Sequence, residues 1–512
     1  MRRAFLVLTG LYFLILPLVH TRLTDQVFEV NKFCFSLGAV AVLSLICVFM
    51  KDQKLVFDKY QKVLLGLFGG FFISLGLSVL FSISPYQSFF GSESYHQGFV
   101  LFLAAFIFGA LLLKVKLGSD DVFAIVIFPL MVGGAVQAAI AIVQYVDPEF
   151  LFSDLVIDKY ANRSIGTFGQ PNFLGRFLLF SLLFDFYYIL RSRDKGFYGF
   201  LFVLTGLGLL ATKSRAALVG AIFGMFLVMF FYLKDKGQVK IFLSCSLMAL
   251  FIGVLAFGDQ FKVRSDSIET RVLIYKNSPE LVSNTPFLGK GLESQGESLE
   301  LLRDEKLFDL VDYRTLARAH NEVLDLVLQI GILGTLFYIG FLVLTFFSAN
   351  KSNPLLVPLV ASFVARMFGF FSVSDVMIFF PLLFLIAFEQ RVFLEIDRRF
   401  LGRIRLLFFV FLFGFTAFST FMADKYFFEG KVEKSLKMQE FNKKYLEESV
   451  SQGLKSGNSS QVKNSLELIN RHHSDWARGY YLRYKYYLHE GDYVEAEASL
   501  IRARELYPEK GW

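Results

Sequence analysis

Charged residues and cysteines are both scarce in this sequence. Asp, Glu, Lys and Arg make up 19% of its 512 residues, below the roughly 25% of an ordinary soluble domain. Cys34, Cys47 and Cys245 are the three cysteines, and each sits in an apolar stretch. Their spacing fits no metal site and no disulfide framework. Hydrophobic residues reach 55%, with 64 phenylalanines, so an ordinary soluble domain is not expected.

The apolar residues are gathered in about thirteen blocks. A helix needs about 20 apolar residues to cross a bilayer, and backbone groups in lipid must be satisfied internally. The sequence therefore predicts an all-α polytopic membrane protein with about 12–13 transmembrane helices. The phenylalanines are expected to face lipid and to fill helix contacts. The blocks lie near 4–19, 33–50, 63–83, 98–113, 122–145, 173–190, 197–212, 216–233, 241–257, 322–347, 354–371, 375–389 and 405–422. The shortest of them are 98–113 and 375–389.

Lys and Arg residues in the short loops predict the orientation, because they gather on the cytoplasmic side. The N-terminus resembles an uncleaved signal sequence and is placed inside. The inner loops then carry most of the basic residues, among them Lys51, Lys54, Lys59, Lys62, Lys114, Lys116, Arg191, Arg193, Lys195, Lys234, Lys236 and Lys240. This orientation places one large extracytoplasmic loop at 258–320. It also places a tail at 423–512 outside, and an error of one span would move the tail to the other side.

Several cations depart from this rule and lie at or near the outer face. They are Arg163, Arg176, Lys213, Arg215 and Arg366. Cations in that zone are costly unless they are paired or solvated. A shared anionic ligand would explain them together. The alternative is that each side chain reaches lipid headgroups separately.

Two short motifs carry four of these cations. Residues 163–176, RSIGTFGQPNFLGR, contain Gly and Pro residues that predict a turn, and Asn172 is a suitable helix N-cap. A helix N-terminus beside Arg163 and Arg176 favours anions. Residues 212–218, TKSRAAL, crowd Lys213 and Arg215 into a short connection, where arginine can donate two hydrogen bonds to one phosphate. Structural turns without a ligand remain the alternative for both motifs.

Two further motifs lie in or after the large loop. The segment that begins at Arg271 has apolar spacing from Val272 to Val282, which predicts an amphipathic helix on the outer surface, and PFLGKG then closes a turn. Residues 318–324, RAHNEVL, lead into the next span, and the sequence continues so that 319–334 read AHNEVLDLVLQIGILG. His320 stands at its start, and histidine transfers protons near neutral pH. A lone interfacial histidine without a catalytic role is the alternative.

Together the four motifs resemble the O-antigen ligase and polymerase superfamily of membrane glycosyltransferases, over roughly residues 160–345. The resemblance implies that Arg215 and Arg271 bind the lipid diphosphate, and that His320, with Asn321 beside it, assists the acceptor hydroxyl. Arg163 and Arg176 would be further phosphate ligands or structural supports, and Lys213 would be a further substrate-binding residue. Tyr275 stands where a common form of the family has Trp, which leaves the subfamily open.

The implied reaction transfers a glycan from undecaprenyl diphosphate at the periplasmic face of the bacterial inner membrane. The acceptor would be lipid A-core, another lipid-linked glycan or a protein hydroxyl. No cofactor, metal ion or nucleic acid is expected, since the diphosphate is already a good leaving group and no outward Asp-x-Asp pair is present. Asp185, in mid-span, is an alternative base or a buried partner of an arginine. A flippase or transporter is the rival class, and a non-catalytic scaffold is a third.

The composition changes at about residue 423, where charged residues and Tyr replace Phe and Leu. Residues 480–508 fit the tetratricopeptide pattern of two helices around a tight turn, marked by Gly491, Ala496, Ala503 and Pro508. Residues 440–476 are a candidate earlier unit. One clear repeat is too short to be stable alone, so the tail is expected either to pack on the membrane part or to bind a protein partner.

Overall fold

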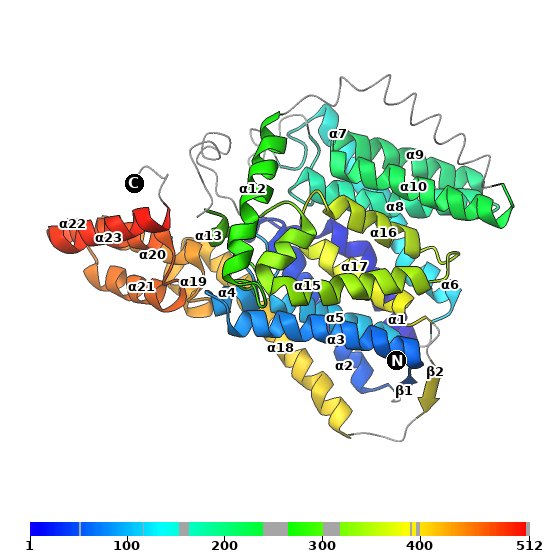
Figure 1. The fold of residues 1–512 in the computed structure, drawn as a ribbon, viewed down its shortest axis with the longest axis horizontal. Coiled ribbons are helices and arrows are strands. Elements are labelled where there is room, and N and C mark those ends of the chain that lie inside the picture. Colours follow the sequence, from blue (N-terminus) through cyan, green and yellow to red (C-terminus); the bar gives the residue numbers. More distant parts are fainter. Residues whose placement is uncertain are drawn as a thin grey trace.

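A computed structural model describes residues 1–50, 53–115, 117–152, 163–238, 265–300, 318–389, 392–395 and 400–507. Within these residues the fold is a bundle of long apolar helices, with a helix across one end of the bundle and a helical tail beyond it (Figure 1). The only strands among them are β1 (Gln53–Val56) and β2 (Val392–Glu395), which form a short antiparallel pair with Gln53 opposite Glu395. The predicted all-α class is confirmed.

Each predicted span within these residues corresponds to a helix. Seven helices are long and apolar enough to cross a membrane, and four apolar helices are shorter. The predicted block at 241–257 lies outside the described residues. The bundle consists of α1 (Arg2–Ile15), η1 (Leu16–Leu18), α2 (Glu29–Val48), α3 (Lys59–Leu80), α5 (Phe99–Lys114), α6 (Ser119–Val122), η2 (Phe123–Ile127), α7 (Phe128–Val146), α8 (Pro171–Arg191), α9 (Lys195–Ala211), α10 (Arg215–Asp235), α15 (Glu322–Ser348), α16 (Leu356–Arg366), α17 (Val373–Ala387) and α18 (Phe400–Phe428).

The two shortest predicted blocks form helices in the interior of the protein. Every residue of α17 is buried, and so are most residues of α5, which packs against it. Phenylalanine rings fill the contact, for example Phe106 and Phe380 with ring centroids 5.3 Å apart and nearly perpendicular planes. Because neighbouring helices surround α17 and α5, neither has to present a long apolar face to lipid.

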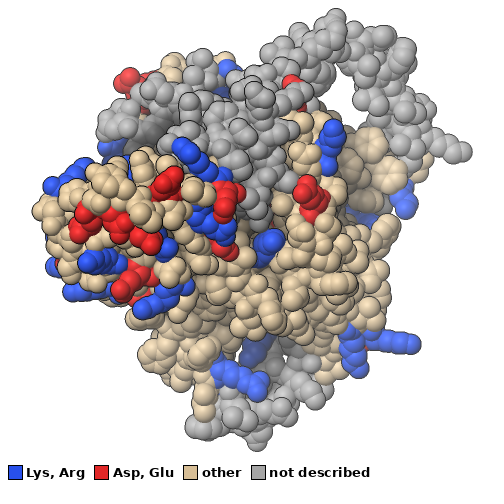
Figure 2. Space-filling view, turned by 60° about the vertical axis from the view of Figure 1, so that its left-hand side comes forward, with Lys and Arg blue, Asp and Glu red and all other residues tan. Residues whose placement is uncertain are grey.

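The phenylalanines of α18 suit the other role expected of this residue, which is to face lipid. Phe408, Phe411, Phe415 and Phe418 are 61%, 74%, 72% and 60% exposed. Their spacing of three and four residues places them on one face of the helix. A row of exposed aromatic rings in a 29-residue apolar helix suits contact with lipid tails rather than with water. Figure 2 shows that charged side chains are crowded on the tail, whereas few lie on the bundle.

The large loop is fastened to α15 at a break in that helix. Gly331 has φ 74°, and the backbone of the PFLGKG turn occupies the space beside it. The Ile332 amide donates to the Pro286 carbonyl at 2.8 Å, and the Gly291 amide donates to the Gln329 carbonyl at 3.0 Å. A Cβ on Gly331 would lie 2.2 Å from the Phe287 carbonyl carbon. Glycine is therefore required here both for its backbone angle and for the close approach.

The described part of the large loop contains α12 (Ser265–Asn284) and α13 (Gln295–Glu300). Ile274 and Leu281 of α12 are buried against Leu299, Ala319 and Leu328. On its outer side Val272 is 55% exposed. The predicted amphipathic helix is thus present, and it lies across one end of the bundle (Figure 1).

The tail is built from short helices connected by tight turns. They are α19 (Val432–Met438), α20 (Lys443–Ser456), α21 (Ser459–His472), α22 (Ala477–Glu490) and α23 (Tyr493–Leu506). Gly457 and Gly491 end α20 and α22 in the left-handed conformation, and Asn458 and Asp492 cap the helices that follow. The predicted helix–turn–helix arrangement is present, whereas the tetratricopeptide assignment stays a prediction. Pro508 lies outside the described residues.

Candidate active site

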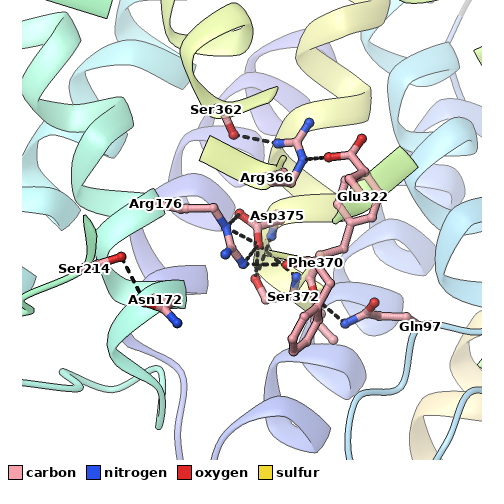
Figure 3. A network of polar contacts seen from close by, with 12 residues as sticks. Gln97, Asn172, Arg176, Ser214, Glu322, Ser362, Arg366, Phe370, Ser372 and Asp375 are labelled. Carbon is pink, nitrogen blue, oxygen red and sulfur yellow. Dashed lines mark hydrogen bonds and ion pairs between the residues drawn. The ribbon is translucent and has the colours of Figure 1, made fainter. Parts of the chain in front are cut away.

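The motifs converge on one end of the bundle. Asn172, in the first turn of α8, accepts hydrogen bonds from the guanidinium of Arg163 at 3.1 Å and from the hydroxyl of Ser214 at 3.0 Å. Ser214 is the N-cap of α10. The contact therefore joins the RSIGTFGQPN turn to the TKSRAAL connection, so these two motifs form one structure (Figure 3).

Buried amide side chains hold the RSIGTFGQPN turn in place. The amides of Ile165 and Gly166 donate to Gln144, and the amide of Thr167 donates to Gln137. Lys32 of α2 donates to the Thr167 carbonyl at 2.5 Å. A turn with this many backbone partners is a rigid platform for the first turn of α8.

Arg163 supports the neighbouring connection. Its Nε donates to the Thr212 carbonyl at 3.1 Å, in addition to the contact with Asn172. Lys213, the next residue, has φ 49°, and its ammonium group lies 5.1 Å from the ring centroid of Tyr145. The arrangement favours the supporting role for Arg163, one of the two roles that the resemblance allowed.

Arg176 is buried and paired within the protein. Its Nη2 lies 2.6 Å from Oδ2 of Asp375, its Nε lies 3.1 Å from the same oxygen, and Nη2 also donates to the Phe370 carbonyl at 2.8 Å (Figure 3). Asp375 also accepts from the amide and hydroxyl of Ser372, the N-cap of α17. Arg176 thus links α8 to the start of α17, which favours a structural role for this arginine as well.

Arg366 has a similar internal partner. Its Nε pairs with Glu322 at the start of α15, and Nη1 donates to Ser362 at 2.6 Å (Figure 3). The hydroxyl of Tyr338 donates to the other oxygen of Glu322. Both members of the ion pair are fully buried. Internal carboxylates therefore account for Arg176 and Arg366, and the single anionic ligand considered for all five outer cations is not needed for these two.

Arg215 and Arg271 are placed differently. Arg215 is the first residue of α10 and is exposed, as is Lys213 beside it. Arg271, on α12, is partly buried. The pKa of the Arg271 guanidinium is lowered, mainly by burial and to a smaller extent by the nearby positive charge of Arg215. Two arginines from distant parts of the sequence thus approach each other despite like charge. Such an arrangement favours an anion between or beside them.

His320 lies near Arg271, in the turn before α15. It has φ 58°, an unusual backbone angle for a residue with a side chain, and strain of this kind clusters at functional sites. Its ring centroid lies 5.3 Å from that of Phe370, and its carbonyl accepts from the Tyr275 hydroxyl at 3.4 Å. Asn321 caps α15 through the Leu324 amide and donates to the Met367 carbonyl at 3.2 Å. Neighbours on α12, α15 and α16 therefore fix the histidine.

Burial lowers the pKa of His320 to about 4, and the positive charges of Arg271, Arg318 and Arg176 contribute in that order. The imidazole is therefore neutral at pH 7 and can accept a proton. Because positive neighbours contribute to the low pKa of His320, an anion bound near them would raise that pKa.

Three functional candidates were not predicted from the sequence. Arg318 is buried, forms an ion pair with Glu293 and contacts the rings of Tyr95 and Phe370, 5.1 and 5.3 Å from their centroids. Arg318 is the first residue of the RAHNEVL motif, and Glu293 follows PFLGKG by two residues, so position in or near a motif was a usable signal for both. The third, Asp375, lies in a span that carries none of the four motifs.

Comparison with known families agrees with the motifs. The model of the O-antigen ligase family matches residues 200–339. The matched region contains Arg215, Arg271 and His320 and supports the resemblance to the O-antigen ligase superfamily. The apolar helices and the match together suggest a multi-pass membrane protein with a glycosyl-transfer or ligase role. No curated protein matches the chain.

Proposed function

We propose that this protein transfers a glycan from undecaprenyl diphosphate to an acceptor hydroxyl at the periplasmic face of the bacterial inner membrane. The carrying observation is the approach of Arg215 and Arg271 beside a neutral His320. The buried cations Arg176, Arg366 and Arg318 have carboxylate partners. The start of α10 and the facing side of α12 carry Arg215 and Arg271, and we place the anionic donor there.

The proposed reaction needs one base and an anion site. His320 accepts the proton of the acceptor hydroxyl, whose oxygen forms a bond to the anomeric carbon of the donor sugar. The bond from that carbon to the diphosphate oxygen breaks, and undecaprenyl diphosphate leaves with the electron pair. Arg215 and Arg271 stabilise the negative charge that develops on the leaving diphosphate. The proton on His320 then passes to the leaving group or to water.

Asp185 is poorly placed as an alternative base. It lies nine residues after Arg176 on α8, which is about 14 Å further along the helix axis. Its Oδ2 accepts from the hydroxyl of Thr205 on α9 at 2.9 Å. The interaction partner is thus a hydroxyl rather than one of the arginines. We assign Asp185 to helix packing and His320 to the chemistry.

A flippase is the second candidate, because a lipid-linked glycan would occupy the same arginines. Transport sites commonly lie near the bilayer midplane. The four motifs instead place their charged groups at one end of the bundle, as the contacts of Asn172, Arg176 and Glu322 illustrate. The charge distribution therefore favours transfer over transport.

The test is a transfer assay with purified protein. Labelled glycan on undecaprenyl diphosphate is offered with lipid A-core, lipid-linked glycan or a hydroxyl-bearing peptide as acceptor. His320→Ala and Arg215→Ala are compared with His489→Ala and Arg502→Ala, matched controls in the tail whose side chains are 54% and 46% exposed. Loss of transfer in the first pair alone supports the proposal, and the acceptor used identifies the subfamily. Glycan crossing reconstituted bilayers without transfer to any acceptor would establish the flippase instead.

A further inference from the structure

The tail packs against the end of the bundle that carries the candidate active site. Its contacts centre on α4 (Pro85–Phe90), a short helix between α3 and α5. The ring of Phe441 stacks on Phe90 with centroids 5.1 Å apart and planes 12° apart, and it also stacks on Tyr86. The Ser84 hydroxyl lies 3.0 Å from Nδ1 of His473 and donates to the His472 carbonyl at 3.2 Å. A cavity of about 10 Å³ at this contact has room for about one water.

The opposite side of α4 holds the large loop. The Gln87 side chain donates to the Glu293 carbonyl at 2.8 Å, and the Ser88 hydroxyl donates to the Leu292 carbonyl at 2.7 Å. The Ser92 amide donates to Oε2 of Glu293 at 3.1 Å, and the Ser92 hydroxyl contacts the same oxygen. Glu293 has φ 63°, so these contacts hold it in a backbone conformation that favours glycine.

The second carboxylate oxygen of Glu293 connects to the segment that carries His320. Oε1 pairs with Arg318, whose guanidinium also donates to Oε1 of Gln97 at 3.1 Å. The side chains of Arg318 and Glu293 are 3% and 1% exposed. Arg318 precedes His320 by two residues, and both contact the ring of Phe370. The position of Arg318 therefore fixes the strained turn that presents His320.

We infer that Glu293 is a positioning residue for His320, and that the C-terminal helices hold it in place through α4. The tail then belongs to the active-site structure. This inference rests on the proposed function only for its kinetic measurements. Since a displacement of about 1 Å can lower a rate about 100-fold, loosening either contact is expected to affect turnover more than donor binding.

The test compares Glu293→Gln, Phe441→Ala and the double variant in the full-length protein. Val494→Ala is the control on the tail, because that side chain is 78% exposed. We expect Glu293→Gln to lower kcat about tenfold or more, and Phe441→Ala to lower it several-fold, with the KM for donor changed less than about twofold. The double variant should be no slower than Glu293→Gln, because both changes interrupt one series of contacts. Wild-type kcat in Glu293→Gln, or losses that multiply in the double variant, would overturn the inference.

A second measurement does not depend on transfer. Diethyl pyrocarbonate modifies accessible neutral histidines, and mass spectrometry follows modification of His320 relative to the exposed His489. Diethyl pyrocarbonate should modify His320 several-fold faster in both single variants than in wild type. In Val494→Ala the rate should equal that of wild type. If wild type transfers no glycan but the modification rates differ in this way, the proposed function fails and the tail connection stands. Unchanged modification rates in both variants would overturn the connection itself.

Discussion

Arg176 and Asp375 form a buried ion pair that joins α8 to the first turn of α17, with 2.6 Å between Nη2 and Oδ2. Removing one member leaves the other charged and buried, which typically costs about 3–5 kcal/mol. We therefore predict that Asp375→Ala lowers the unfolding temperature in detergent markedly, as measured by a thermal shift assay. Arg176→Ala should destabilise similarly.

Arg215→Ala provides the contrast, because Arg215 is exposed. Its unfolding temperature should remain close to that of wild type. A fully stable Arg176→Ala variant with weakened donor binding would show that Arg176 acts as a phosphate ligand after all.

The second prediction concerns donor binding by Arg271. A hydrogen bond to a charged group contributes about 1.5–3 kcal/mol, so Arg271→Gln should weaken binding of undecaprenyl diphosphate by about 10- to 100-fold. Arg271→Lys should recover part of the affinity, since it restores the charge without the two-pronged geometry. Binding is measured by displacement of a fluorescent polyprenyl diphosphate. Equal affinity of wild type and Arg271→Gln would remove Arg271 from the anion site.

Periodicity and hydropathy were sufficient to predict the helices, because each span must satisfy its own backbone in lipid. They could not distinguish lipid-facing from interior spans by length alone. The 15-residue α17 illustrates this, since its short apolar block reflects burial by neighbouring helices rather than a weak span. The break at Gly331 was also missed, because its cause is the PFLGKG turn, about 40 residues away in the sequence, packed against α15.

The candidate site was predictable where a motif placed chemistry at a span boundary. His320, Arg215 and Arg271 were found in this way, and the structure brings Arg271 near each of the other two. The carboxylate partners Asp375 and Glu293 were not found, because a pairing between distant segments leaves no local pattern. Without those partners, Arg176 looked like a free cation that needed a ligand.

The third prediction tests which end of the bundle faces the periplasm. Val146 is the last residue of α7, at the end that carries the motifs, and is 82% exposed, and Arg193 lies in the basic turn after α8. A membrane-impermeant maleimide should label Val146→Cys in intact cells, and it should label Arg193→Cys only after the inner membrane is opened. The native cysteines are replaced by serine beforehand. Labelling in the opposite order would invert the orientation and place the candidate site in the cytoplasm.

The fourth prediction follows from the low pKa of His320. In the free protein the imidazole is neutral above about pH 4, because burial and the charges of Arg271, Arg318 and Arg176 oppose protonation. The pH dependence of kcat/KM reports ionisations of the free enzyme, so kcat/KM should not change with pH above about pH 5. A bound diphosphate offsets the positive charges and raises the pKa of His320 in the complex. The pH dependence of kcat reports ionisations of the enzyme–donor complex. The acid limb of the kcat profile should therefore lie at higher pH than the acid limb of the kcat/KM profile.

Arg271→Gln supplies the internal check on the sign. Loss of one positive neighbour should raise the pKa of His320 in the free enzyme and move the acid limb of kcat/KM toward neutral pH. The matched control Arg502→Ala, in the tail, should leave both limbs in place. The profiles are measured with saturating acceptor and varied donor at constant ionic strength, since salt weakens exposed charges. Coincident limbs for kcat and kcat/KM in wild type would show that the diphosphate does not act on the charge environment of His320, and would separate the base from the anion site.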